Sequence, residues 1–149
     1  MAELQNPDPL VEAVAKARAK VSQRPDIKFP TGTLNQIGND VYAYSGVITF
    51  TDTGTDALNF VSGAEYISAR ATVSTLDYSG DDMGIEITLN GTTIIRQRFS
   101  TLGVIYLQAL PVWDIIIPPF TKVNITFTNL ADNSPHTANI VLTGEVRQP

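Results

Sequence analysis

The chain has 149 residues, of which 43% are hydrophobic and only 17% are charged, and its formal net charge is −5. This length fits one domain that can bury a core without metals or cross-links. The absence of cysteine excludes a disulfide framework, a thiolate metal site and a thiol nucleophile. A charged fraction below the usual value of about 25% predicts a surface rich in Thr, Ser, Asn and Gly, or one covered by partners.

Charge is distributed unevenly along the chain. Residues 1–28 carry five basic against four acidic side chains, whereas residues 29–149 carry five against eleven. We expect no nucleic-acid partner, because that affinity comes mainly from Lys and Arg neutralising phosphates. The N-terminus lacks the basic start and apolar run of a signal peptide, and no stretch approaches the roughly 20 apolar residues of a membrane span. We therefore expect synthesis in the cytoplasm and no membrane partner.

The N-terminal residues predict one short amphipathic helix. Asp8 suits the N-cap and Pro9 the first helical position, ahead of an Ala-, Lys- and Arg-rich run over residues 10–22. Apolar residues recur there at alternating spacings of four and three, which forms a narrow stripe typical of a groove or coiled-coil contact. The stripe, our candidate partner-binding site, consists of Leu10, Val14, Ala17 and Val21.

Two destinations for this helix remain open: its own sandwich or a neighbouring subunit. Two heptads are too few for a helix to be stable alone, so the helix needs one of these two surfaces to pack against. Prolines and glycine between residues 24 and 33 break the helix and predict a linker. We divide the chain into an arm, residues 1–28, and a β-sandwich domain, residues 29–149.

After the linker, the hydrophobic period changes to two. Residues 41–50 predict a long strand with Tyr42, Tyr44, Ile48 and Phe50 on one side. Residues 66–76 predict a second long strand, whose buried face carries Ile67, Ala69, Ala71 and Val73 and whose wet face carries Ser68, Arg70, Thr72 and Ser74.

The strongest local signal is a hairpin. Apolar alternation from Met83 to Leu89 leads into Asn90-Gly91, and residues 92–99 follow. Further strands are predicted at residues 57–61, 104–110, 114–117, 123–128 and 139–146. Eight or nine regularly spaced strands without intervening helices predict an all-β, antiparallel two-sheet sandwich, and most simply a jelly roll.

No catalytic or metal-binding constellation stands out. His136, the single histidine, lies in a turn-like segment without a Gly-x-Ser-x-Gly elbow, and we interpret it as a loop residue. Glu86 is expected on a wet face, and nothing selects a carboxylate partner for it. The loops at residues 52–56 and at Asp81-Asp82 hold oxygen ligands without the spaced calcium-binding set, which favours plain turns and leaves a loop-bound calcium ion as the alternative. We expect no cofactor. Arg96 and Arg98 are expected to share a strand face. This face is either solvated, or it forms a patch that makes ion pairs or binds a partner.

The C-terminal third resembles a known class of proteins. Residues 114–130 followed by residues 138–146 resemble the strand, proline-marked corner and two closing strands of viral jelly-roll proteins, and also capsid-associated and decoration proteins of bacteriophages. The resemblance covers residues 38–147 as a pattern and carries no site residues. It implies a role in building or stabilising a virion shell, often as a symmetric oligomer whose terminal arm reaches a neighbour.

We therefore expect a non-enzymatic virion structural protein, a homo-oligomer that contacts other virion proteins such as the major capsid protein. One alternative is a carbohydrate- or receptor-binding module, whose candidate aromatic residues are Tyr42, Tyr44, Tyr66, Tyr78, Tyr106 and Trp113. Another is a carboxylate-based glycosidase, which would need a cleft holding two acids.

Overall fold

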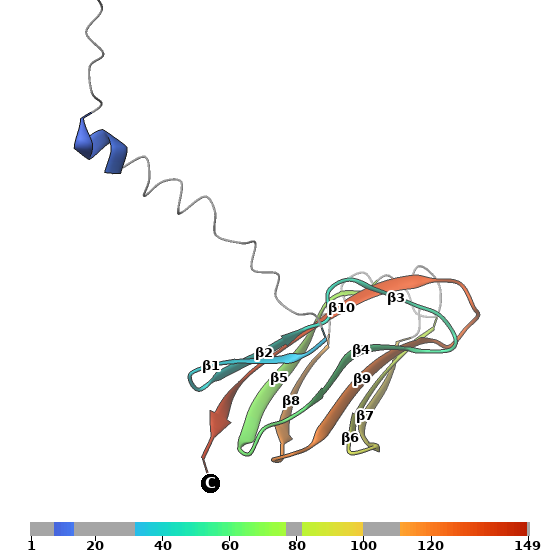
Figure 1. Cartoon of the computed structure of the whole chain (residues 1–149). Coiled ribbons are helices and arrows are strands. Elements are labelled where there is room, and N and C mark those ends of the chain that lie inside the picture. The colour runs from blue at the N-terminus through green and yellow to red at the C-terminus, as the bar shows by residue number, and fades with distance from the viewer. Residues whose placement is uncertain (1–7, 14–31, 77–81, 100–110, 149) are drawn as a thin grey trace, which may run out of the picture.

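The computed structural model describes residues 8–13, 32–76, 82–99 and 111–148 (Figure 1). Residues 9–13 are helical, and the rest of the described chain is built from strands. The strands are β1 (Leu34–Ile37), β2 (Asp40–Tyr44), β3 (Ile48–Phe50), β4 (Thr55–Val61), β5 (Tyr66–Leu76), β6 (Met83–Leu89), β7 (Thr92–Phe99), β8 (Val112–Ile117), β9 (Lys122–Asn129) and β10 (His136–Arg147).

The strands form two antiparallel sheets. The larger has the order β1-β2-β10-β5-β8, with β3 also paired to β10, and the smaller has the order β4-β9-β6-β7. Figure 1 shows the two sheets as the two layers of the body. The predicted all-β, antiparallel two-sheet sandwich is thereby confirmed. The predicted boundary between residues 28 and 29 lies outside the described residues.

A single hydrophobic core fills the space between the sheets. It consists of aliphatic and aromatic side chains from the inner face of every strand pair. Phe50 of β3 and Phe127 of β9 meet across the two sheets, with ring centroids 5.6 Å apart. Burying one such side chain contributes about 1.5–3 kcal/mol, so this contact joins the layers.

The two clearest sequence predictions match the structure. β5 spans the predicted residues, and its inner face carries the four buried residues Ile67, Ala69, Ala71 and Val73. β6 and β7 form the predicted hairpin, in which Asn90 and Gly91 have φ angles of 50° and 79°. Positive φ at both central residues is what a type I′ turn requires.

The prediction for residues 41–50 was wrong in two respects: these residues do not form one continuous strand, and the four residues placed on one side do not all point the same way. Two short strands, β2 and β3, replace one long strand, and Val41 and Ala43 enter the core in place of Tyr42 and Tyr44. Gly46, with a φ of 67°, lies in the break between them. The break shifts the alternation by one residue, so Phe50 points inward although it shares parity with the outward-facing tyrosines.

Other differences lie at the ends of the pattern. β1 was not predicted, because its Leu34-Asn-Gln-Ile37 sequence has little alternation and follows a glycine-containing linker. The strand predicted at residues 104–110 lies outside the described residues. β10 begins three residues earlier than predicted, at His136.

β5 and β10 approach each other unusually closely at Gly144. A Cβ atom built on this glycine would lie 2.3 Å from the backbone oxygen of Ser68 and 2.8 Å from the Cα of Ala69. Backbone atoms on a central strand cannot move aside without disturbing the sheet. Glycine within a strand often marks such an approach, and here it is required.

We predict that Gly144→Ala lowers the free energy of unfolding by about 1–3 kcal/mol, because the added methyl group overpacks the β5–β10 contact. Chemical denaturation measures the change. Gly63→Ala is the matched control, since a Cβ there meets nothing within 4 Å, and it should stay within about 0.5 kcal/mol of wild type. Equal effects of the two substitutions would contradict the packing argument.

Candidate functional site

The N-terminal helix begins as predicted. The Leu10 amide donates to Oδ1 of Asp8 at 3.0 Å, and the Glu12 amide donates to the Asp8 carbonyl at 3.1 Å, so Asp8 is the N-cap. Leu10, the first residue of the predicted stripe, is 73% exposed. The other three stripe residues, Val14, Ala17 and Val21, lie outside the described residues, so the docking role of the stripe remains a prediction.

His136 does not lie in a loop, which corrects our interpretation. It opens β10, is 5% exposed, and its ring centroid lies 6.2 Å from that of Phe50. The Ser134 hydroxyl lies 3.2 Å from Nε2 of His136 and donates to Oδ1 of Asp132. The serine therefore lies between the acid and the imidazole, whereas a catalytic triad places the imidazole between the serine and the acid.

This chain of contacts belongs to a folded turn around Asn129. The buried Asn129 amide nitrogen donates to Oδ1 of Asp132 and to the Ser134 carbonyl, both at 3.0 Å. Its oxygen accepts from the amides of Ala131 and Asp132. Hydrogen bonds from the Ser134 hydroxyl, the Ser134 amide and the Asn129 side chain lower the pKa of Asp132, and the Ser134 hydroxyl is the largest cause. The network fixes the β9–β10 connection.

Three further carboxylates are held by neighbours on the smaller sheet, and Asp114 is held on the larger sheet by Arg70. Asp56 accepts hydrogen bonds from Asn124 and Thr126, both at 3.0 Å. Asp82 pairs with Arg98, and Glu86 with Arg96 at 3.1 Å. Within the described ranges no group of three or more His, Asp or Glu side chains is arranged to hold a metal ion. Asp81 lies outside those ranges.

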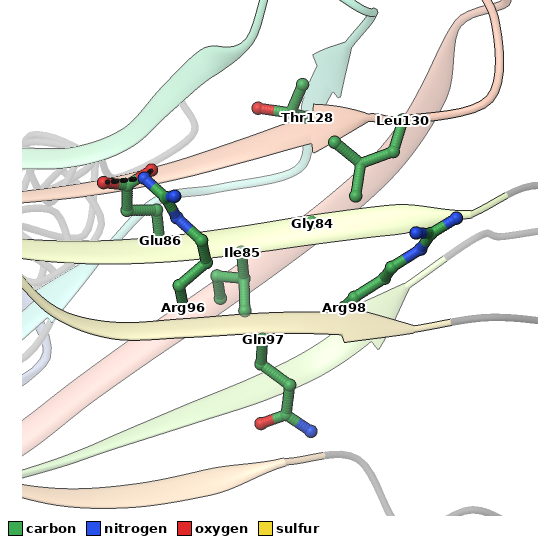
Figure 2. A pocket seen from close by; sticks show the side chains of 8 residues that line it. All are labelled: Gly84, Ile85, Glu86, Arg96, Gln97, Arg98, Thr128 and Leu130. Carbon is green, nitrogen blue, oxygen red and sulfur yellow. Dashed lines mark hydrogen bonds and ion pairs between the residues drawn. The ribbon is translucent and has the colours of Figure 1, made fainter.

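A shallow cleft separates the two arginines (Figure 2). Gly84 forms its floor, and Leu130 leans over that glycine so closely that a Cβ there would lie 3.2 Å from Cδ1 of Leu130. Arg96 closes one end and Arg98 the other, in a cleft of about 310 Å³. The two arginines share a face, as predicted, and their pairing with Glu86 and Asp82 favours the ion-pairing alternative over a solvated face.

The charges at the cleft are already satisfied within the chain. A hydrogen bond from Thr93 and the Arg96 guanidinium lower the pKa of Glu86, so this carboxylate is an anion at neutral pH and not a proton donor. Both guanidinium groups are engaged by acids. The cleft offers an apolar floor with balanced polar ends, which suits a weak contact more than an acid–base reaction.

The aromatic residues considered for ligand binding do not gather in one cleft. Tyr44 and Tyr66 are exposed on the outer face of the larger sheet, Tyr42 is half-buried there, and Trp113 packs against the core. Tyr78 and Tyr106 lie outside the described residues. The described aromatic residues therefore do not support a sugar-stacking site.

A feature that sequence reasoning missed lies at the proline-marked corner between β8 and β9. Phe120, directly after Pro118-Pro119, has a φ of 52° and a side chain that is 71% exposed. Left-handed backbone costs roughly 1–2 kcal/mol for a residue with a Cβ. Glycine or asparagine is the usual residue at that position of such a turn. A phenylalanine directly after two prolines, where a turn usually has glycine or asparagine, is the only sign in the sequence of this exposed, left-handed residue.

No family model matches the chain, and no curated protein matches it in sequence. In the described part of the chain, no helix has the length and apolar character needed to cross a membrane.

We predict that the turn around Asp132 loses stability in acid. The folded-state pKa is lowered from 3.8, so the stabilisation is complete above pH 3.8 and is lost as the pH falls through the folded value. Asp132→Asn should therefore flatten the fall of the melting temperature below pH 3.8. Ser134→Ala should reproduce much of this effect. Acid profiles that run parallel to wild type for both variants would refute the coupling.

Proposed function

We propose that this chain is a non-enzymatic structural protein of a virion, a capsid-associated or decoration protein that stabilises a shell through protein–protein contacts. The proposal starts from the order of the strands, which supplies the fold, and is carried by the apolar side chains that the surface exposes. β2 and β3 both pair with β10 and count as one strand, which leaves eight strands after β1 is set aside.

When the eight strands are numbered in chain order, the larger sheet has the spatial order 1-8-3-6 and the smaller sheet has the spatial order 2-7-4-5. This order supports a jelly roll, the double-sheet fold built from two Greek keys. Viral capsid domains and lectin domains both use it. The choice between these functions therefore rests on the surface and not on the fold.

The surface favours contacts with proteins. Exposed large apolar side chains lie on outer strand positions and turns, including Ile37, Val112, Ile116 and Phe120, and not within one concave site. The arm adds a capped helix with Leu10 and Val11 exposed. Contacts with neighbouring proteins would remove this apolar area from water. The partners we propose are further copies of the chain and other virion proteins, above all the major capsid protein.

The alternative function is a carbohydrate- or receptor-binding module. The cleft at Gly84 favours it, because apolar floor and polar ends are combined there. The lack of an aromatic residue among its lining side chains weakens it for sugars.

We predict that the full chain is an oligomer in solution and that a chain lacking residues 1–28 has a smaller mass, because the arm supplies part of the contact. Light scattering at matched concentrations measures both masses, and circular dichroism checks that the shortened chain keeps its β-structure. Equal masses would contradict the role of the arm. A glycan that raises the melting temperature of the full chain would favour the alternative.

The stripe itself is tested by charge. Val14→Asp combined with Val21→Asp should lower the mass of the oligomer while the sandwich stays folded. Ala15→Asp combined with Ala19→Asp is the control, since the same charges then lie on the opposite side of the helix that the sequence predicts. Identical masses for the two double variants would contradict docking through the stripe.

A further inference from the structure

One end of the sandwich presents a fixed, exposed aromatic ring. This end, which we call the apolar tip, is formed by residues 61–66, 90–91 and 118–122, the turns at the lower end of the body in Figure 1. Phe120 lies at its corner with φ at 52° and most of its side chain in solvent. An exposed phenyl ring gains nothing from its own chain that would offset a left-handed backbone. Strain of this kind tends to mark functional positions.

The strained corner is held from several directions. The Phe120 amide donates to the Gly63 carbonyl at 2.8 Å. The buried Ser62 hydroxyl donates to the Pro118 carbonyl at 2.7 Å and accepts from the Thr121 amide at 2.8 Å. The ring is therefore presented on a prearranged backbone, which lowers the conformational entropy that a contact would cost.

Further exposed apolar side chains flank the corner. Val61 ends β4, and Ile116 lies two residues before Pro118; both are exposed. Lys122 pairs with Val61 in the β4–β9 register, and Asn90 ties the β6–β7 turn to Lys122 by two hydrogen bonds of 2.8 Å. Val61 and Ile116 lie on the outer faces of opposite sheets, one on each side of the corner, and aromatic residues such as Phe120 are enriched in interfaces.

Charge indicates which partner fits. Residues 29–149 carry eleven acids against five bases, so two copies of the body repel each other over most of their surfaces. The end of the sandwich that holds the tip carries three acids, Asp40, Glu65 and Glu145, and two bases, Lys122 and Arg147, so its net side-chain charge of −1 is small beside that of the whole body. Two acidic copies can therefore approach most easily tip to tip, where apolar area is also available.

We propose that the apolar tip is a self-association surface, in which Phe120 of one copy packs against the tip of a second copy around a rotation axis. This inference rests on the proposed function for the expectation that copies associate, and it adds the surface and the partner. A contact that repeats the same patch on each copy closes into a symmetric oligomer.

Phe120→Gly separates the two roles of the residue. Glycine adopts positive φ without strain, so the folded monomer should keep or raise its melting temperature. Removal of the ring should nevertheless weaken self-association about tenfold or more, the scale of an interface anchor. Sedimentation velocity of the full chain over a concentration series measures association, and thermal unfolding of the dilute protein measures the fold.

Val47→Ser is the matched control, because Val47 is equally exposed but lies between β2 and β3, outside the tip; it should leave association unchanged. The proposal is overturned if Phe120→Gly associates like wild type, if it lowers the melting temperature of the monomer by several degrees, or if wild type stays monomeric at every concentration. If Phe120→Gly associates like wild type but association still depends on residues 1–28, the tip proposal fails and the proposed function remains supported.

Discussion

The position of β10 in the middle of the larger sheet is the constraint on which the rest of the structure depends. β10 pairs with β2 and β3 on one side and with β5 on the other. Ser45 ties it further, because the Ser45 amide donates to the Ile140 carbonyl and the Ile140 amide donates to the Ser45 hydroxyl. The larger sheet is complete only when the last strand of the chain has joined it. Such distant pairing makes folding slow but closes the sandwich firmly.

A frame held in this way can tolerate strained or polar features at its ends. At one end, the Asn129 turn holds Asp132, Ser134 and the buried His136 in a hydrogen-bonded chain. At the other, Ser62 and Thr121 hold the backbone of Phe120 in a left-handed conformation. The first feature is explained by the fold, since it forms the β9–β10 connection. The second forms the β8–β9 corner, but the fold does not explain the exposed ring of Phe120, for which we propose a role in binding.

The sequence predicted the regular parts of the fold because alternation and turn chemistry agree there. β5 alternates apolar and polar residues without interruption, and Asn90-Gly91 adopts the backbone that its residue types favour. Prediction failed where one residue changes the register, as at Gly46, since the tyrosines of β2 have the apolar character of a core face. His136 was misplaced because its burial depends on Phe50, which is distant in sequence.

The candidate sites were less predictable than the fold. The ion pairs of Arg96 and Arg98 follow from strand pairing, but the cleft between them depends on Gly84 and Leu130, which come together only in the folded sheet. The exposure of Phe120 likewise follows from a backbone conformation that its residue type disfavours.

Quantitative mass spectrometry of purified virus particles, from cells that produce the protein, tests directly the proposal that this chain is a shell component. We expect the chain to copurify with the particles at a fixed ratio to the major capsid protein and to stay with them after a high-salt wash. Recovery of the chain only in the fraction without particles would contradict it.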